Sequence, residues 1–172
     1  MSRTRFQDLL AALSRERVEF ILVGGWAAVV HGSAHITQDV DVCYSRSPEN
    51  LERLCRAVLP LKPALRGAPR DLPFRLDPPT LKAGLNFTLE TELGALDLLG
   101  ELSPLGGYDQ VLPHSSAVPL FGLSVRVLSL SALIRAKRAA GRPKDLLMVP
   151  ELEALEAMQQ SPPVAPPPPR RA

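Results

Sequence analysis

Two aspartates separated by one valine interrupt an otherwise apolar segment near residue 40. Asp39 and Asp41 alternate with Val40 and Val42, which predicts a strand. Residues i and i+2 of a strand point to the same face, so the two carboxylates would lie side by side. Their repulsion and desolvation would both be relieved by a bound cation. Solvent-facing acids are the alternative interpretation of an isolated Asp-x-Asp pair.

A third aspartate, Asp97, stands within the apolar run 95–99, which also predicts a strand. An acid in so apolar a strand is unfavourable to bury unless it is paired or binds a metal. If this strand lies beside the Asp39–Asp41 strand, three carboxylates converge. Such a cluster can hold magnesium ions, which take oxygen ligands and bridge to substrate phosphates.

A glycine pair precedes the first two acids. Residues 18–23 form a β-rich run that ends at Gly24-Gly25, and residues 26–31 predict a short helix. Glycines let the backbone approach a ligand closely, and a helix N-terminus offers unpaired N–H groups to a phosphate. Two glycines also occur in many ordinary turns.

The rest of the chain mixes helices and strands without a regular alternation. We therefore expect an α/β or α+β domain built around a small mixed β-sheet flanked by helices. In the first half of the chain, we predict a helix over 4–16, a helix from Pro48 with Ser47 as N-cap, and a long loop with one helical turn over 60–82. Strands follow over 85–89 and 95–99, and a hairpin over 118–128 turns at Phe121-Gly122. A helix then runs from Ser129 or Ser131 to Ala139 and is ended by Gly141, and a last helical region is opened by Pro143 and interrupted by Pro150.

Length and composition indicate one domain. The 172 residues are 45% apolar and 22% charged, which is ordinary for a globular protein with a real core. We assign residues 1–160 to this domain and residues 161–172 to a disordered Pro-rich tail. Cys43 and Cys55 lack metal-ligand spacing and are expected in the core. No apolar run is long enough to span a membrane, so a cytoplasmic location is expected.

The net charge of +2 does not by itself indicate nucleic-acid binding, but its distribution is uneven. Residues 46–75 hold seven basic residues against three acidic ones, an excess that could attract phosphate-bearing partners. A solvated helix face followed by an exposed loop explains the same charges equally well.

Several segments together resemble the signature of the polymerase β-type nucleotidyltransferase superfamily. They are Val23-Gly24-Gly25-Trp26-Ala27, His31-Gly32, Thr37-Gln38-Asp39-Val40-Asp41 and the later stretch 133–146, with Asp97 where the third carboxylate would come. Within the superfamily, the chain is most similar to the small bacterial nucleotidyltransferases related to abortive-infection toxins. The likeness spans roughly residues 18 to 147. Gly25 stands where many members have serine, and His35 stands where relatives often have arginine.

This resemblance implies the nucleotidyltransferase fold and transfer of a nucleoside monophosphate from a nucleoside triphosphate, such as ATP, to a hydroxyl. Two Mg²⁺ ions, with Mn²⁺ as a substitute, would be the cofactors. The site residues implied are Asp39, Asp41 and Asp97 for metal and catalysis, Lys137 for catalysis and nucleotide binding, and Gly24, Gly25 and Asp145 for nucleotide binding.

Helical spacing alone also predicts the direction of the Lys137 side chain. Lys137 continues the apolar stripe of Leu130, Leu133 and Ile134 on one helical face, which directs it toward the sheet. A lysine whose stem lies along the edge of the stripe is the alternative. Asp145 could equally be structural, paired with Arg142 or placed to favour the dipole of the last helix.

The acceptor is not fixed by the sequence. Relatives modify tRNA ends, proteins or small molecules, and the basic stretch mildly favours RNA. A toxin role with an antitoxin protein as partner follows from family likeness alone. Two alternatives remain: a catalytically silent nucleotide- or RNA-binding module of the same fold, and a protein that acts through its Pro-rich tail.

Overall fold

A computed structural model describes residues 5–69 and 71–161, so the expected tail, 161–172, lies outside this range except for Ser161. The centre of the fold is a seven-stranded mixed sheet in the order β3-β4-β5-β2-β1-β9-β8. Its strands are β1 (Phe20–Val23), β2 (Val40–Tyr44), β3 (Ala64–Leu65), β4 (Asn86–Thr91), β5 (Gly94–Leu99), β8 (Ser115–Leu120) and β9 (Leu123–Leu128). The expected mixed sheet flanked by helices is confirmed.

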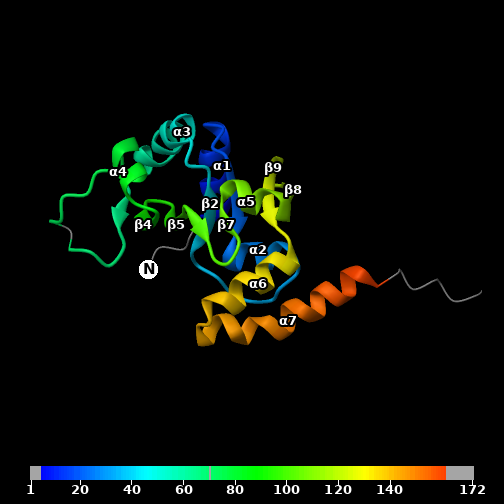
Figure 1. Cartoon of the computed structure of the whole chain (residues 1–172). Helices are drawn as coiled ribbons and strands as arrows, with labels where there is room; N and C mark the ends of the chain where they lie inside the picture. Colours follow the sequence, from blue (N-terminus) through cyan, green and yellow to red (C-terminus); the bar gives the residue numbers. More distant parts are fainter. Residues whose placement is uncertain (1–4, 70, 162–172) are drawn as a thin grey trace, which may run out of the picture.

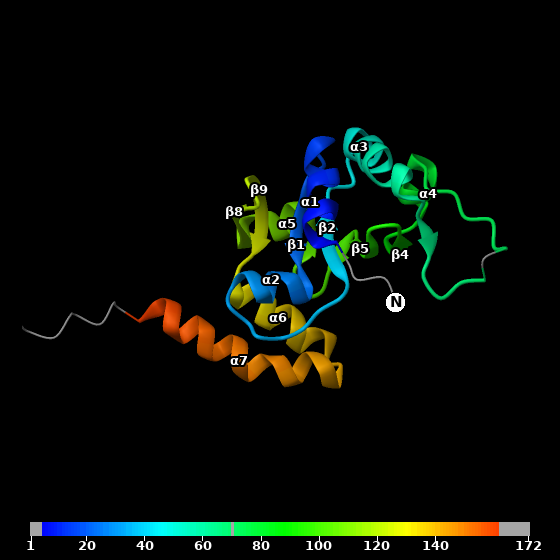
Figure 2. The same ribbon diagram turned by 180° about the vertical axis from the view of Figure 1, so that it is seen from behind.

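Helices surround this sheet on both faces and at one end (Figure 1). In the reverse view of Figure 2, α1 lies in front of β1 and β2, whereas α5 lies on the opposite face of the sheet. Helices α2, α6 and α7 gather at the end of the sheet where β1 stops, and α7 extends away from the body in both views. The helices are α1 (Phe6–Arg15), α2 (Gly24–Val30), α3 (Pro48–Val58), α4 (Pro78–Ala83), α5 (Tyr108–Val111), α6 (Leu130–Ala140) and α7 (Pro143–Gln160).

The central strands are apolar on both faces because helices cover them. All four residues of β1 are buried, and β2 is buried except at Asp41. β1 runs antiparallel to β2, and β2 runs parallel to β5. The two acids of the strands, Asp41 and Asp97, are therefore the polar exceptions within the buried centre of the sheet.

Several local signals in the sequence set the element boundaries. The Ser47 hydroxyl accepts a hydrogen bond from the backbone N–H of Asn50, which caps α3. Ser129 rather than Ser131 caps α6, and Gly141 ends that helix at a φ of 64°. The predicted hairpin turn at Phe121-Gly122 is confirmed between β8 and β9. Cys43 and Cys55 are both buried, as expected.

Two expectations about local structure are wrong. The last helix is not interrupted at Pro150 but continues through it to Gln160. Proline there removes a hydrogen bond to Leu146, and because both residues are exposed, water can hydrate the freed carbonyl. The segment 60–82 holds more than a loop, since it contains the short η1 (Leu59–Leu61), β3 and α4. Sequence patterns also do not reveal η2 (Leu112–His114) or the small sheet of β6 (Glu101–Leu102) and β7 (Gly106–Gly107), because these elements are too short to show a period.

No helix in the described ranges has the length and apolar character needed to cross a bilayer.

Candidate active site

The acids of β2 and β5 meet in one row across the sheet. Asp41 is the register partner of Val23 on one side and of Asp97 on the other. Register partners share a face, so the side chains of Asp41 and Asp97 point the same way, and Asp39 shares the face of Asp41 by strand alternation. The predicted neighbourhood of the two acid-bearing strands is therefore present.

The backbone of Gly24 packs closely against the side chain of Asp41. Gly24 is the first residue of α2 with a φ of +63°, and a Cβ built there would lie 2.2 Å from Oδ2 of Asp41. Gly25 is equally close to Thr37, whose Oγ1 would lie 2.5 Å from an added Cβ. Only glycine lets the start of α2 approach the acids so closely, which places its first N–H groups next to the carboxylates.

Burial and neighbouring acids raise the pKa of Asp41 and Asp97. Burial, together with the negative charges of Asp97 and Asp39, raises the pKa of Asp41 to about 7, against the more distant Lys137 and Lys144. Burial also raises the pKa of Asp97, although the guanidinium of Arg66 opposes this effect. The site therefore holds more negative charge than its surroundings neutralise, and Asp41 is the least compensated member.

Arg66, which sequence patterns did not single out, joins two of the three acids. Its Nη2 lies 2.6 Å from Oδ1 of Asp97, and its Nη1 lies 3.4 Å from Oδ1 of Asp39. Within the described residues, no three acidic, His or Cys side chains are gathered closely enough to hold a metal ion at their present positions. The acids are neighbours, but Arg66 occupies the space between Asp39 and Asp97.

The donor chemistry nevertheless suits a hard divalent cation. All three side chains offer carboxylate oxygens, which Mg²⁺ and Mn²⁺ prefer. Burial and the two neighbouring acids raise the pKa of Asp41, and a bound cation would relieve the unfavourable effect of both on its charged form. Asp39, Asp41 and Asp97 are therefore the residues that would hold such an ion.

On the opposite wall, Lys137 and Asp145 form a buried ion pair. Lys137 Nζ donates to Oδ1 of Asp145 at 2.9 Å, and the two residues are only 8% and 3% exposed. Arg142 Nε donates to Oδ2 of the same carboxylate at 2.5 Å, which is the pairing that the sequence suggested. Burial alone would raise the pKa of Asp145, but the hydrogen bonds from Lys137 and Arg142 outweigh it and lower that pKa. The inward direction of Lys137 is as predicted, and Asp145 is its partner.

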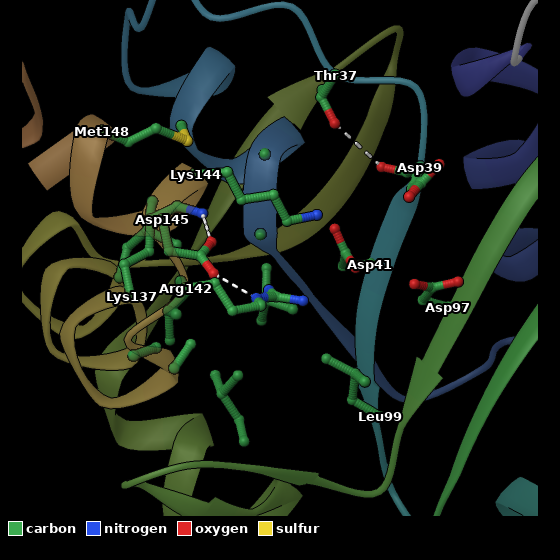
Figure 3. Close-up of a pocket in the computed structure, with 18 of the residues that line it drawn as sticks. Thr37, Asp39, Asp41, Asp97, Leu99, Lys137, Arg142, Lys144, Asp145 and Met148 are labelled. Atoms are coloured by element: carbon green, nitrogen blue, oxygen red, sulfur yellow. Dashed lines mark hydrogen bonds and ion pairs between the residues drawn. The ribbon is translucent and has the colours of Figure 1, made fainter.

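Lys144 is a cation of the cleft that the sequence analysis overlooked. Figure 3 shows its ammonium directed toward Asp41, while Lys137 and Arg142 turn to Asp145. Within the described part of the chain, Lys144 forms no ion pair. Its position in the first turn of α7 places it at the mouth of the same cleft as Asp145, but no sequence pattern singles it out.

These two walls enclose a cleft of about 190 Å³. One side carries Gly24, the acids and Thr37, and the other carries the cations at the α6–α7 junction. Five apolar side chains also line it: Leu99, Leu102, Leu128, Leu133 and Met148. The cleft therefore combines acids, cations and apolar surface, as binding sites for polar ligands with an apolar part do.

The basic stretch 46–75 is largely neutralised within the chain. Arg56, Lys62 and Arg75 pair with Glu16, Glu92 and Asp77 respectively, and Arg66 pairs with the acids of the cleft. Arg46 and Arg53 donate to backbone carbonyls, while Arg70 lies outside the described ranges. Four of the six described cations of this stretch therefore have acidic partners, whereas Arg46 and Arg53 keep their charge without one among the described residues.

Comparison with known proteins finds relatives by structure rather than by sequence. No family model matches the sequence, and no curated protein matches it. A Thermotoga maritima protein that carries a provisional description as a nucleotidyltransferase superposes with a TM-score of 0.50 at 14% identity, covering 90% of this chain and 88% of its own. ANT(2'')-Ia in complex with adenylyl-2''-tobramycin gives a TM-score of 0.55 at 16% identity, covering 89% of this chain and 93% of its own. The solution structure of the antibiotic-resistance factor ANT(2'')-Ia gives 0.53 at 16% identity, covering 90% and 89%.

These neighbours show that the chain has the nucleotidyltransferase fold, in agreement with the sequence resemblance. At such identities the likeness concerns the fold, and the chemistry has to be argued from the site itself.

Proposed function

We propose that this chain transfers a nucleoside monophosphate from a nucleoside triphosphate to a hydroxyl acceptor. The observation that carries the proposal is the pairing of Asp41 with Asp97 in register, against the backbone of Gly24, in a cleft whose other wall is cationic. The structural neighbours support nucleotidyl transfer as the general class of reaction.

In the proposed reaction, the acceptor hydroxyl attacks the α-phosphorus, and the bond from that phosphorus to the bridging oxygen breaks as pyrophosphate leaves. Asp39, Asp41 and Asp97 would hold Mg²⁺, which would neutralise charge on the triphosphate and lower the pKa of the attacking hydroxyl. Asp97 accepts the hydroxyl proton. This role suits it because burial raises its pKa above that of an ordinary aspartate.

The triphosphate contacts the two cationic elements of the cleft. Backbone N–H groups at Gly24 and Gly25 bind phosphate oxygens at the start of α2. Lys144 supplies the mobile positive charge, because its ammonium faces Asp41 with no ion pair to break within the described chain. Lys137 acts mainly through Asp145, which fixes the α6–α7 junction from which Lys144 projects.

For the acceptor, we favour a small hydroxylated molecule over RNA. The ANT(2'')-Ia structure contains an adenylylated small molecule, adenylyl-2''-tobramycin. The internal pairing of four basic residues also weakens the case for RNA that the basic stretch had made. The toxin role and an antitoxin partner rest on the sequence resemblance alone.

The decisive experiment incubates the full chain with Mg²⁺ and each α-labelled nucleoside triphosphate. Separate reactions offer a panel of polyhydroxylated amines, total RNA and lysate protein as acceptors. Asp41→Asn and Asp97→Asn should each abolish label transfer, whereas Asp71→Asn, an exposed loop acid, should not. Transfer that survives both site variants contradicts the proposed mechanism. Nucleotide binding without any transfer favours the silent module instead.

A matched chain lacking residues 162–172 tests the tail hypothesis. We expect this truncated chain to keep full transfer activity, because every residue of the proposed site lies upstream. Loss of activity in an otherwise folded truncation would favour a protein that acts through its tail.

A further inference from the structure

Arg66 connects the two outer members of the acid cluster. A single guanidinium contacts Asp97 at 2.6 Å and Asp39 at 3.4 Å, from a side chain that is 31% exposed. Asp97 is 14% exposed and Asp39 46%, so the inner contact is the better shielded of the two. The arginine thus occupies carboxylate oxygens that a divalent cation would also need.

Arg66 satisfies only part of its hydrogen-bonding capacity in its contacts with the two acids. Its Nη1 is buried and makes no hydrogen bond to any described atom, because its contact with Asp39 has the distance of an ion pair but not the geometry of a hydrogen bond. A buried donor without an acceptor is unfavourable. Because Nη1 is already unsatisfied in this contact, the release of the Arg66 side chain breaks, among the described residues, only the hydrogen bond of Nη2 to Asp97.

The backbone around Arg66 leaves it room to move. Arg66 follows β3, a two-residue strand at the edge of the sheet, and is held there by its N–H to the carbonyl of Thr88 at 2.9 Å. The next residue, Gly67, has a φ of +78° and no atom within 4 Å of an added Cβ. Figure 1 shows the chain leaving the sheet here in a long excursion before α4.

We propose that Arg66 is an internal counterion that competes with divalent cations for Asp39 and Asp97 and thereby sets the metal affinity of the site. This inference rests on the proposed function in one respect, that the acid cluster binds a divalent cation. A cation that takes Oδ1 of Asp97 as a ligand repels the guanidinium and displaces its Nη2, so cation binding through that oxygen includes release of Arg66. Asp41, which Arg66 does not contact, stays open as the first ligand.

Mn²⁺ binding by the full chain, without nucleotide, tests this competition. Calorimetric titration at pH 7.5 compares the wild type with Arg66→Gln, Arg66→Lys and Arg75→Gln. Removing the guanidinium should tighten Mn²⁺ binding about tenfold, because a competing charge leaves the same oxygens. The Mn²⁺ affinity of Arg66→Lys should lie between those of the wild type and Arg66→Gln, since lysine keeps the charge but loses the planar guanidinium that reaches both acids. Arg75, which is 87% exposed and paired with Asp77 outside the cleft, is the matched control and should change nothing.

A second measurement needs no variant. In hydrogen exchange on the wild type, Mn²⁺ should speed up exchange of the Arg66 amide and its neighbours in 64–69, because release of the side chain loosens the edge strand. Unchanged exchange at saturating Mn²⁺ overturns the inference, as does a folded Arg66→Gln variant that binds Mn²⁺ no tighter than the wild type.

Asp41→Asn separates this inference from the proposed function. If the wild type binds Mn²⁺ and Asp41→Asn does not, but Arg66→Gln matches the wild type, the role of Arg66 fails and the metal site stands. If neither the wild type nor Arg66→Gln binds Mn²⁺, the metal part of the proposed function fails and the inference fails with it.

Discussion

Asp41 on β2 and Asp97 on β5 are direct register partners on neighbouring parallel strands. This relationship brings together two acids that are 56 residues apart in the sequence, in the buried centre of the sheet. It also makes the site unfavourable for folding, because each carboxylate raises the energy of the other's charged form.

Asp41→Asn should stabilise the fold while abolishing transfer. The folded-state pKa of Asp41 is about 7 against 3.8 for an ordinary aspartate, so the unfolded chain loses this proton first as the pH rises. The free energy of unfolding should therefore fall between about pH 4 and pH 7, a slope that Asp41→Asn reduces. At pH 8 with a chelator, we expect the variant to be more stable by about 2 kcal/mol, a discounted value of the full pKa shift. Urea unfolding at pH 5 and pH 8 measures this.

Asp71→Asn is the control for that comparison, because Asp71 is exposed in the loop before α4. It should leave both the slope and the activity unchanged. A variant Asp41→Asn that is less stable than the wild type at pH 8 would show that Asp41 has a close counterion in solution.

Lys144→Ala should weaken binding of the nucleoside triphosphate without affecting folding. The side chain is exposed at the cleft and faces Asp41, so its loss removes one charge-assisted contact to a phosphate. We expect the dissociation constant for the triphosphate to rise about tenfold, equivalent to about 1.4 kcal/mol. Fluorescent nucleotide titration measures this, and Lys82→Ala, an exposed lysine on α4, is the matched control.

Sequence patterns predicted the parts of the site that lie on regular strands. Asp41 and Asp97 stood out because each interrupts an apolar run, and strand alternation then fixed their faces. Arg66 was not predicted, because it follows a two-residue edge strand that shows no period and its partners come from other strands. The direction of Lys137 followed from its helical stripe, but its pairing with Asp145 depends on the turn at Gly141, which joins α6 and α7. Which described cation of the cleft lacks an ion-pair partner therefore depends on three-dimensional packing and cannot be predicted from the sequence.

Asp145→Asn should destabilise the protein by about 3 kcal/mol, because it leaves the ammonium of Lys137 buried without a charged partner. Since hydrogen bonds lower the pKa of Asp145, its stabilisation is present above pH 4 and is lost as the pH falls through the folded-state pKa. Glu153→Gln gives the control, because Glu153 pairs with Arg138 between the same two helices but on the surface. That exposed pair should contribute less than about 1 kcal/mol. Equal losses in thermal unfolding for the two variants would contradict a special role for the buried pair.

Gly24→Ala and Gly122→Ala separate backbone strain from the geometry of the site. Both glycines have positive φ, at +63° and +76°, so each substitution should lower stability by about 1 kcal/mol from the left-handed backbone alone. An added Cβ at Gly122 meets no atom within 4 Å, whereas at Gly24 it lies 2.2 Å from Oδ2 and 2.9 Å from Cβ of Asp41. Asp41 can escape the clash only by turning away from its position beside Asp97. We therefore expect Gly24→Ala to lower transfer by about 100-fold, as misplacement of a reacting group by about 1 Å does. Gly122→Ala, which has the backbone strain but not the clash, should retain wild-type activity. If the two variants lose activity equally, the close approach of α2 to Asp41 has no part in the reaction.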